Sequence, residues 1–169
     1  MDPKNNHLLD RTALHHVFVC QLSLVYAAKL HLIDSLPALI RQAAFPQLRM
    51  ALEEDLGDSQ QQMASLREIL RLLNENVKTE HCLGMNAIIE EAHGQVLFFD
   101  GKNYESDMSI IFYMGVIEHM QVGAGRMLNL ITSTPEYASY KLLVEQTVDM
   151  STDNANLFNV IAAEYIRKN

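Results

Sequence analysis

The sequence predicts an all-α protein in which four long helices and one short helix form a bundle. Only 7 glycines and 4 prolines occur in 169 residues, too few turn-forming residues for a sandwich or barrel of many strands. Apolar residues instead recur every three or four positions over long stretches, which is the period of a helix with one buried side. The length suits one domain, so we expect a single domain over residues 1–169, with residues 1–13 as an N-terminal extension.

Two long helices are predicted in the first half of the chain. The first spans residues 14–44, and Pro37 inside it predicts a kink or short interruption because proline lacks the backbone donor that a helix needs. The second begins at Pro46, since proline is favoured in the first turn, and ends before Asn74. Its apolar positions predict one buried face, formed by Leu52, Leu56, Met63, Leu66 and Leu70.

The second half predicts one short helix followed by two more long ones. The short helix covers residues 83–99, residues 100–103 form a turn, and a long helix follows over residues 104–131. The last helix is expected to begin at Thr134-Pro135-Glu136, where threonine caps the helix and proline takes its first position. It continues to about residue 166.

The charge of the chain argues against nucleic-acid binding. Thirteen basic and 21 acidic side chains give a formal charge of −8 and a pI near 5.3, and no basic cluster interrupts this balance, so phosphate neutralisation is excluded as a function. We see no uninterrupted apolar run of membrane-spanning length and no signal segment. The expected location is therefore the cytoplasm, with no membrane partner.

The cysteines and the paired glycines of the sequence are expected to have structural roles and no catalytic or metal-binding role. Cys20 and Cys82 lie far apart in the sequence, form no metal-ligand or disulfide pattern, and are expected to be small core residues. Gly123 and Gly125 lie within the helix expected over residues 104–131. There they predict a close approach of two helices.

Acidic residues on the inward faces are the candidate functional groups. Four acids share or border the helical stripes that should face the core: Asp55, Asp58, Glu118 and Asp149. Carboxylates directed inward from several helices are what an iron or manganese site in a bundle core requires. The alternative is that these acids stand at the edge of the apolar stripe and reach solvent, because acids are rarely buried without partners.

Several short motifs, taken in order, resemble the YciF-type ferritin-like proteins, a bacterial domain family of unknown function. The resemblance covers about residues 16 to 165. It rests on Tyr26-Ala27-Ala28, Leu36-Pro37, Asp58-Ser59-x-x-Gln62, Ile89-Glu90-Glu91-Ala92, Asp107 and Ile117-Glu118-His119. It implies an antiparallel four-helix ferritin-like bundle with a short extra helix between the helix pairs. It also implies a homodimer, an association with stress responses, and a carboxylate and histidine metal site at mid-bundle.

The chain departs from the family at the implied metal ligands. Lys29 stands where the first helix usually carries a glutamate, Asp55 where the second carries a histidine, and Gln121 where the fourth carries another glutamate. A two-metal cluster carries four or more positive charges and needs carboxylates to neutralise them. Lys29 is therefore predicted to replace the metal's charge by pairing with Glu118 and with Asp58 or Asp149. The alternative is that its long side chain reaches outward to solvent.

The function expected from these residues is that of a stress-associated ferritin-like bundle with a degenerate metal site. Such a protein would act by self-association or as a structural protein, without enzymatic activity and without a cofactor, and its partner would be a second copy. The alternative is an iron- or manganese-binding protein with one or two metal ions and oxidase or iron-handling activity. Its ligands would be Asp55, Asp58, Glu118 and Asp149.

Overall fold

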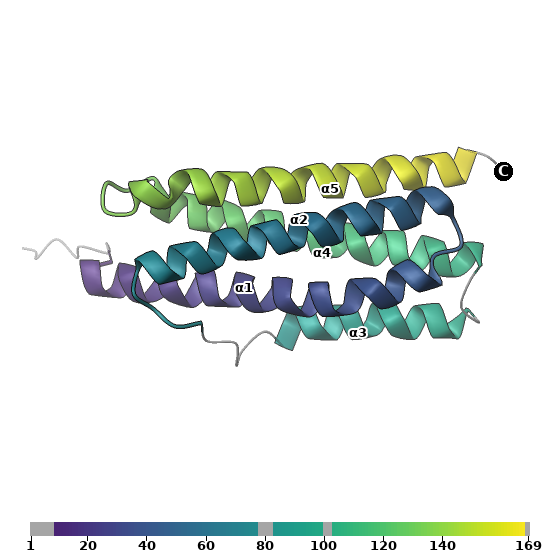
Figure 1. Ribbon diagram of the computed structural model, residues 1–169, viewed down its shortest axis with the longest axis horizontal. Coiled ribbons are helices and arrows are strands. Elements are labelled where there is room, and N and C mark those ends of the chain that lie inside the picture. Colours follow the sequence, from purple (N-terminus) through teal and green to yellow (C-terminus); the bar gives the residue numbers. More distant parts are fainter. Residues whose placement is uncertain (1–8, 78–82, 100–102, 168–169) are drawn as a thin grey trace, which may run out of the picture.

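The computed structural model describes residues 9–77, 83–99 and 103–167, and over these ranges it contains helices and no strand. The all-α prediction is therefore confirmed. Four long helices and one shorter helix follow one another along the chain (Figure 1): α1 (Arg11–Gln42), α2 (Pro46–Leu72), α3 (Leu83–Phe98), α4 (Tyr104–Thr132) and α5 (Lys141–Arg167). A single 3-10 turn, η1 (Ala138–Tyr140), precedes α5.

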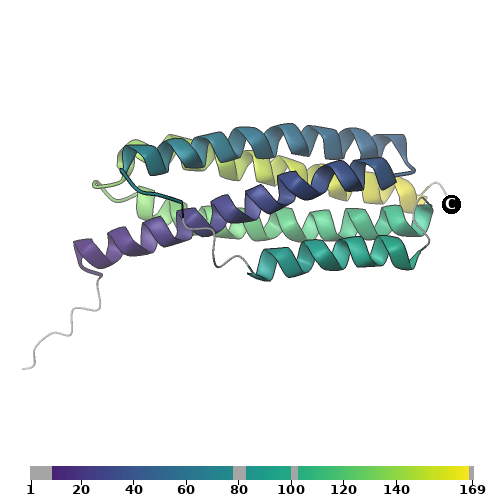
Figure 2. The ribbon, with the colours of Figure 1, turned by 60° about the horizontal axis from the view of Figure 1, so that its bottom comes forward.

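The four long helices form a closed antiparallel ring. α1 packs on α2, α2 on α5, α5 on α4, and α4 back on α1. The short helix α3 lies outside this ring against α1 and α4, as both ribbon views show (Figures 1 and 2). This is the predicted bundle, with the extra helix between the two helix pairs in the sequence.

Local side chains set where the helices begin. The Asp10 carboxylate accepts the Ala13 N–H at 2.8 Å and so caps α1. Asn103 caps α4 in a reciprocal pair with Ser106, whose hydroxyl accepts the Asn103 N–H at 3.1 Å. The rest of the turn predicted at residues 100–103 lies outside the described residues. Pro46 occupies the first turn of α2, as predicted.

Pro37 lies inside α1 and does not interrupt it, so of the two predicted effects the short interruption is absent. One predicted boundary is wrong. The last helix begins at Lys141 instead of Thr134, because the Thr134 hydroxyl donates to the Ile131 carbonyl at 2.7 Å and so completes the end of α4. The intervening turn is anchored by Tyr137, which is 2% exposed and packs on Phe18 with ring centroids 4.7 Å apart.

The core consists of two apolar clusters, one toward each end of the bundle. The first includes Leu36, Leu48, Leu52, Ile110 and Phe158, and the second includes Phe18, Leu22, Leu66, Leu70 and Val144. The predicted face of α2 is confirmed at Leu52, Leu66 and Leu70, while Leu56 and Met63 are partly buried and pack against the two clusters from the side. Between the clusters, every long helix contributes at least one buried polar side chain.

Two small-residue predictions have different outcomes. Gly125 allows α4 to approach α5 closely, since a Cβ atom there would lie 2.5 Å from Cγ2 of Val148. A Cβ atom at Gly123 would meet nothing within 4 Å, so that glycine makes no close contact.

Cys20 is exposed rather than part of the core, because the buried side of α1 runs through Phe18, Val19 and Leu22. Cys82 lies outside the described residues.

One described helix, α1, is long and apolar enough to cross a membrane by length and composition alone. This differs from the expectation that no such apolar run exists. Within the bundle, 56% of its most apolar window is buried, and the core helices of soluble proteins pass the same test. In the bundle, α1 packs against three neighbouring helices, α2, α3 and α4.

Candidate functional site

A layer of buried polar side chains separates the two apolar clusters, and we call it the polar layer. No member is more than 6% exposed. α1 contributes one side chain, α2 three, α4 two and α5 three. They are Lys29; Asp55, Ser59 and Gln62; Glu118 and Gln121; and Thr147, Ser151 and Asn154.

Lys29 stands at the centre of the polar layer. Its side chain is 0% exposed, its ammonium lies 3.5 Å from Oε1 of Glu118, and it donates to the Ser59 hydroxyl at 3.4 Å. The predicted pairing with Glu118 is confirmed, and the alternative in which Lys29 reaches solvent is wrong. A buried charge is tolerated only when it is paired and hydrogen-bonded, so each of these two residues requires the other.

Asp55 is the second buried carboxyl of the layer. Its Oδ1 accepts from the Ser59 hydroxyl at 3.1 Å and from the Asn154 side-chain amide at 3.2 Å. Burial, and then the negative charge of Glu118, raise the pKa of Asp55 to about 8, against the smaller opposing effects of Lys29 and Ser59. The raised pKa favours the neutral form of the Asp55 carboxyl.

Two glutamines complete the layer. The Gln62 side-chain amide donates to the Thr147 carbonyl at 2.9 Å and to the Ser151 hydroxyl at 3.0 Å, which ties α2 to α5. The Gln121 amide donates to Oε1 of Glu118 at 3.1 Å. Oε1 of both glutamines, Oδ2 of Asp55 and Oε2 of Glu118 have no hydrogen-bond partner in the part of the chain that the structure describes. Four buried oxygen atoms of the layer are therefore unpaired there.

The structure brings two of the four predicted acids together and leaves two apart. Asp55 and Glu118 are 0% exposed, so the alternative of edge positions is wrong for them. Asp58 is half-buried, and Asp149 is exposed on α5. The inward prediction for Asp149 fails because successive helix positions differ by about 100°, and the buried side of α5 here runs through Val148 and Ser151.

The fit of the polar layer to a metal ion can be tested on its donor atoms. Across residues 9–77, 83–99 and 103–167, no three His, Cys, Asp or Glu side chains are grouped as metal ligands would be. The Lys29 ammonium occupies the space beside Glu118, where its charge repels a second cation. These residues do not fit the carboxylate-rich set that a two-metal centre requires.

Sequence reasoning missed the α5 side of the layer. Thr147, Ser151 and Asn154 follow the three-and-four spacing of the buried positions Val144 and Phe158, and this spacing is the signal that could have found them. Short polar residues are more often found on the surface, so the sequence analysis did not count these three as buried positions of α5. Their contribution is to accept and donate hydrogen bonds across the core.

A third buried acid, Asp107, lies outside the polar layer and joins three parts of the bundle. Its carboxylate accepts the backbone N–H groups of Ala44 at 2.9 Å and Phe45 at 2.7 Å, in the turn between α1 and α2. It also accepts the Tyr165 hydroxyl at 2.6 Å, near the end of α5. Burial, followed by this hydrogen bond, raises the pKa of Tyr165. Asp107 therefore holds the bundle end together, a role that its sequence position did not suggest.

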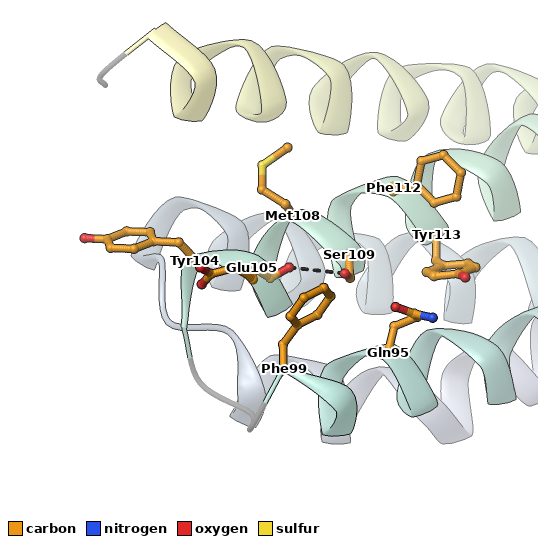
Figure 3. A pocket seen from close by; sticks show the side chains of 8 residues that line it. All are labelled: Gln95, Phe99, Tyr104, Glu105, Met108, Ser109, Phe112 and Tyr113. Atoms are coloured by element: carbon orange, nitrogen blue, oxygen red, sulfur yellow. Dashed lines mark hydrogen bonds between the residues drawn. The ribbon is translucent and has the colours of Figure 1, made fainter.

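Two shallow clefts flank the outer face of α4. The first has a volume of about 580 Å³ between α3 and α4, and its lining includes Phe99, Tyr104 and Phe112. In Figure 3 the Phe99 ring lies beside Ser109, while the Tyr104 side chain points away from it. The Ser109 hydroxyl donates to the Glu105 carbonyl at 3.1 Å. The second cleft, about 660 Å³, shares Met108 and Phe112 with the first and extends to α5. Both are lined mainly by apolar and aromatic side chains.

The comparisons with known proteins agree with this fold. The E. coli stress protein YciF superposes with a TM-score of 0.86 and 22% identity, covering 92% of this chain and 98% of that one. YcfI from Rhodopseudomonas palustris, a candidate structural protein, superposes with a TM-score of 0.80 and 16% identity, covering 92% and 96%. No curated protein matches the sequence. The pattern of the domain of unknown function DUF892 matches residues 13–169, so the chain belongs to the DUF892 family and is a YciF-like helical protein.

Proposed function

We propose that this protein is a non-enzymatic, stress-associated structural bundle that works without a metal ion and acts by self-association. The observation that carries the proposal is the buried contact between Lys29 and Glu118, 3.5 Å apart with neither side chain exposed. An ammonium group supplies one positive charge and three donors. It therefore performs for Glu118 the neutralisation that a metal ion performs in a carboxylate-rich bundle.

The charge balance favours this function over the iron- or manganese-binding alternative. The pKa of Asp55 is raised, which favours its neutral form, and the Lys29 ammonium already faces the Glu118 carboxylate at 3.5 Å. A divalent cation entering this set would meet one carboxylate already paired and an ammonium beside it. Oxidase or iron-handling chemistry needs at least one held metal ion, so it has no support in these residues.

The outer face of α4 supports the self-association part of the proposal. Phe112 is 63% exposed and stands between the two clefts that share it. A projecting ring beside a hollow is complementary to a second copy of itself about a two-fold axis, and exposed apolar patches of this kind mark interaction surfaces. We therefore assign a homodimer to this face. The exposed free thiol of Cys20 fits a reducing compartment, so we place the dimer in the cytoplasm.

Metal content tests the metal-free part of the proposal. The protein is purified without chelators, incubated anaerobically with Fe²⁺ or Mn²⁺, desalted, and measured by mass spectrometry for metal per chain. We expect well below one ion per chain and a melting temperature that EDTA does not change. One or two retained ions per chain, together with a lower melting temperature in EDTA, would favour the metal-binding alternative.

Light scattering on size-exclusion fractions tests the dimer. The wild-type chain is expected to elute at twice its 19.2 kDa mass, and Phe112→Ser is expected to shift the mass toward the monomer. Leu130→Ser is the matched control, because Leu130 lies on the same helix, is 66% exposed and lines neither cleft. A wild-type monomer at high concentration, or equal weakening by both variants, would remove this interface.

A further inference from the structure

The acidic and basic side chains of α4 divide into a buried pair and an exposed pair. Asp107 and Glu118 are 0% exposed, whereas Glu105, in the first turn, and Arg126, in the last two turns, are exposed. Neither Glu105 nor Arg126 forms an ion pair with any residue that the structure describes. The outer side of α4 thus carries one unpaired acid and one unpaired base, about 31 Å apart along the helix axis.

An exposed ring and a glycine lie between these two charges on the same side of α4. Successive residues of a helix differ by about 100°, so Phe112, Gly115 and the two charged residues fall within about 80° of one another. Phe112 is 63% exposed, and in Figure 3 its ring points away from Phe99, on the α3 side. Gly115 lines the cleft between α4 and α5, and a Cβ atom there would meet nothing within 4 Å. The ring is therefore a projection, and the glycine is part of a hollow.

A two-fold axis makes these features complementary to each other. In such a dimer the same surface meets itself, so if one residue contacts a second, the second also contacts the first. Two α4 helices that meet about a two-fold axis perpendicular to them run antiparallel. Glu105 of one copy then lies toward Arg126 of the other, and this contact occurs twice. A parallel pair would instead bring like charges together, which weakens binding.

The charged pair and the ring and glycine pair place the axis at nearly the same level of α4. The midpoint between Glu105 and Arg126 falls between residues 115 and 116, and the midpoint between Phe112 and Gly115 falls between residues 113 and 114. These levels differ by about 3 Å along the helix, a difference that long glutamate and arginine side chains can span. One arrangement therefore satisfies both pairs of residues.

We propose that two copies of this chain pair through α4 in this antiparallel register, with each Phe112 ring over Gly115 of the other copy and each Glu105 against Arg126. The proposal rests on the homodimer inferred above and adds the register and the basis of partner choice. The surface selects a second copy because an acid, a ring, a glycine and a base in this order are matched by the same order read in the opposite direction.

An exchange of the two charges tests the register. Sedimentation velocity gives the dissociation constant of the dimer for the wild type, for Glu105→Arg, for Arg126→Glu and for the double variant. Each single variant places like charges together twice and is expected to dissociate at least about tenfold more readily, while the double variant should return to within about threefold of the wild type. Because the two positions are about 31 Å apart in one chain, such a recovery requires contact between copies.

The control for net charge is Glu53→Arg. Glu53 is an exposed residue of α2, across the ring of helices from α4, and its replacement is expected to leave the dissociation constant unchanged. A wild-type dimer whose double variant stays as weak as either single variant would overturn the register and leave the homodimer standing. A wild-type monomer would overturn both.

A leucine at Gly115 tests the seat of the ring. An added Cβ atom at Gly115 or at Gly57, an exposed position of α2, would meet nothing within 4 Å of the same chain. Gly115→Leu is expected to weaken the dimer at least about tenfold, because its side chain fills the space that Phe112 of the other copy would occupy. Gly57→Leu is expected to dimerise as the wild type does. Unchanged dimerisation of Gly115→Leu would overturn the assignment of Gly115 as the seat.

Discussion

The Lys29 ammonium lies 3.5 Å from the Glu118 carboxylate at a level of the bundle where neither side chain reaches solvent. α1 and α4 are adjacent helices of the ring, so this contact crosses the core between elements far apart in the sequence. Removing one partner of such a pair leaves an uncompensated buried charge. The pair therefore couples helix packing to the charge balance of the polar layer.

Replacing Lys29 by glutamate should turn the polar layer from a site that repels a metal cation into one that binds it. Lys29→Glu is expected to lower the free energy of unfolding by roughly 3–5 kcal/mol, because it adds a third carboxyl beside Glu118 and Asp55 and removes their cation. Mn²⁺ is expected to raise the melting temperature of this variant and to leave that of the wild type unchanged. Thermal unfolding with and without MnCl₂ measures both effects.

Lys29→Met separates lost charge from gained carboxylate. It is expected to be destabilised to a similar extent and to show no response to Mn²⁺, because it adds no metal ligand. If Lys29→Glu is as stable as the wild type and also ignores Mn²⁺, the two acids do not converge on position 29 as described.

The buried Asp55 predicts a pH dependence of stability. Its pKa is about 8 in the folded protein against an ordinary value of 3.8, so the folded state keeps a proton that the unfolded chain releases. The stabilisation is complete below about pH 4 and is lost as the pH rises through about 8, with a slope of up to about 1.4 kcal/mol per pH unit. Urea unfolding of the wild type between pH 5 and 8 should show this decline.

Asp55→Asn should flatten that decline, because an amide mimics the protonated acid and does not titrate. The difference between the wild-type and variant curves isolates this one group from all others. Asp153→Asn, an exposed change on α5, is expected to leave the slope as it is. Parallel curves for the wild type and Asp55→Asn would show that Asp55 is ionised throughout.

The glycines of α4 should respond in opposite directions to alanine. At Gly125 the new methyl group meets Cγ2 of Val148, and a β-branched side chain cannot rotate away easily, so overpacking should cost about 1–3 kcal/mol. At Gly123 nothing lies within 4 Å, so the better helix propensity of alanine should stabilise by up to about 1 kcal/mol. Chemical denaturation of Gly125→Ala and Gly123→Ala measures the contrast, and stabilisation of both would mean that α4 and α5 lie further apart.

The apolar face of α2 gives a direct check of the core. Leu66 is 0% exposed, so Leu66→Ala is expected to lower the free energy of unfolding by about 2–5 kcal/mol. Leu72 is 50% exposed on the same helix, and Leu72→Ala should stay within about 0.5 kcal/mol of the wild type. Comparable losses for the two variants in urea unfolding would show that the helix is rotated from the phase described.

The sequence predicted the helices well because their apolar spacing is long and regular. The boundaries of α2 and α4 agree with prediction to within a residue or two. The inward position of Lys29 came from the family resemblance, since a lysine in an apolar stripe is otherwise read as reaching solvent. Glu118 and Asp55 could be placed near the core, but only the structure shows that both are wholly buried.

The α5 side could not be predicted for a physical reason. Thr147, Ser151 and Asn154 interrupt its apolar stripe, so the helix phase was ambiguous and Asp149 was assigned to the wrong side. The start of the last helix was also predicted wrongly, because Thr134 hydrogen-bonds at the end of α4 instead of capping the start of α5. Local capping signals do not specify which helix they serve.

The measurement closest to the central claim is a double-mutant cycle of Lys29→Met and Glu118→Gln, followed by urea unfolding at neutral pH. We predict that each single variant loses about 3–5 kcal/mol, because each leaves one buried charge alone. The double variant should lose much less than their sum, because no uncompensated charge remains. Losses that simply add, to within about 0.5 kcal/mol, would contradict the claim that Lys29 acts as the internal counter-charge of Glu118.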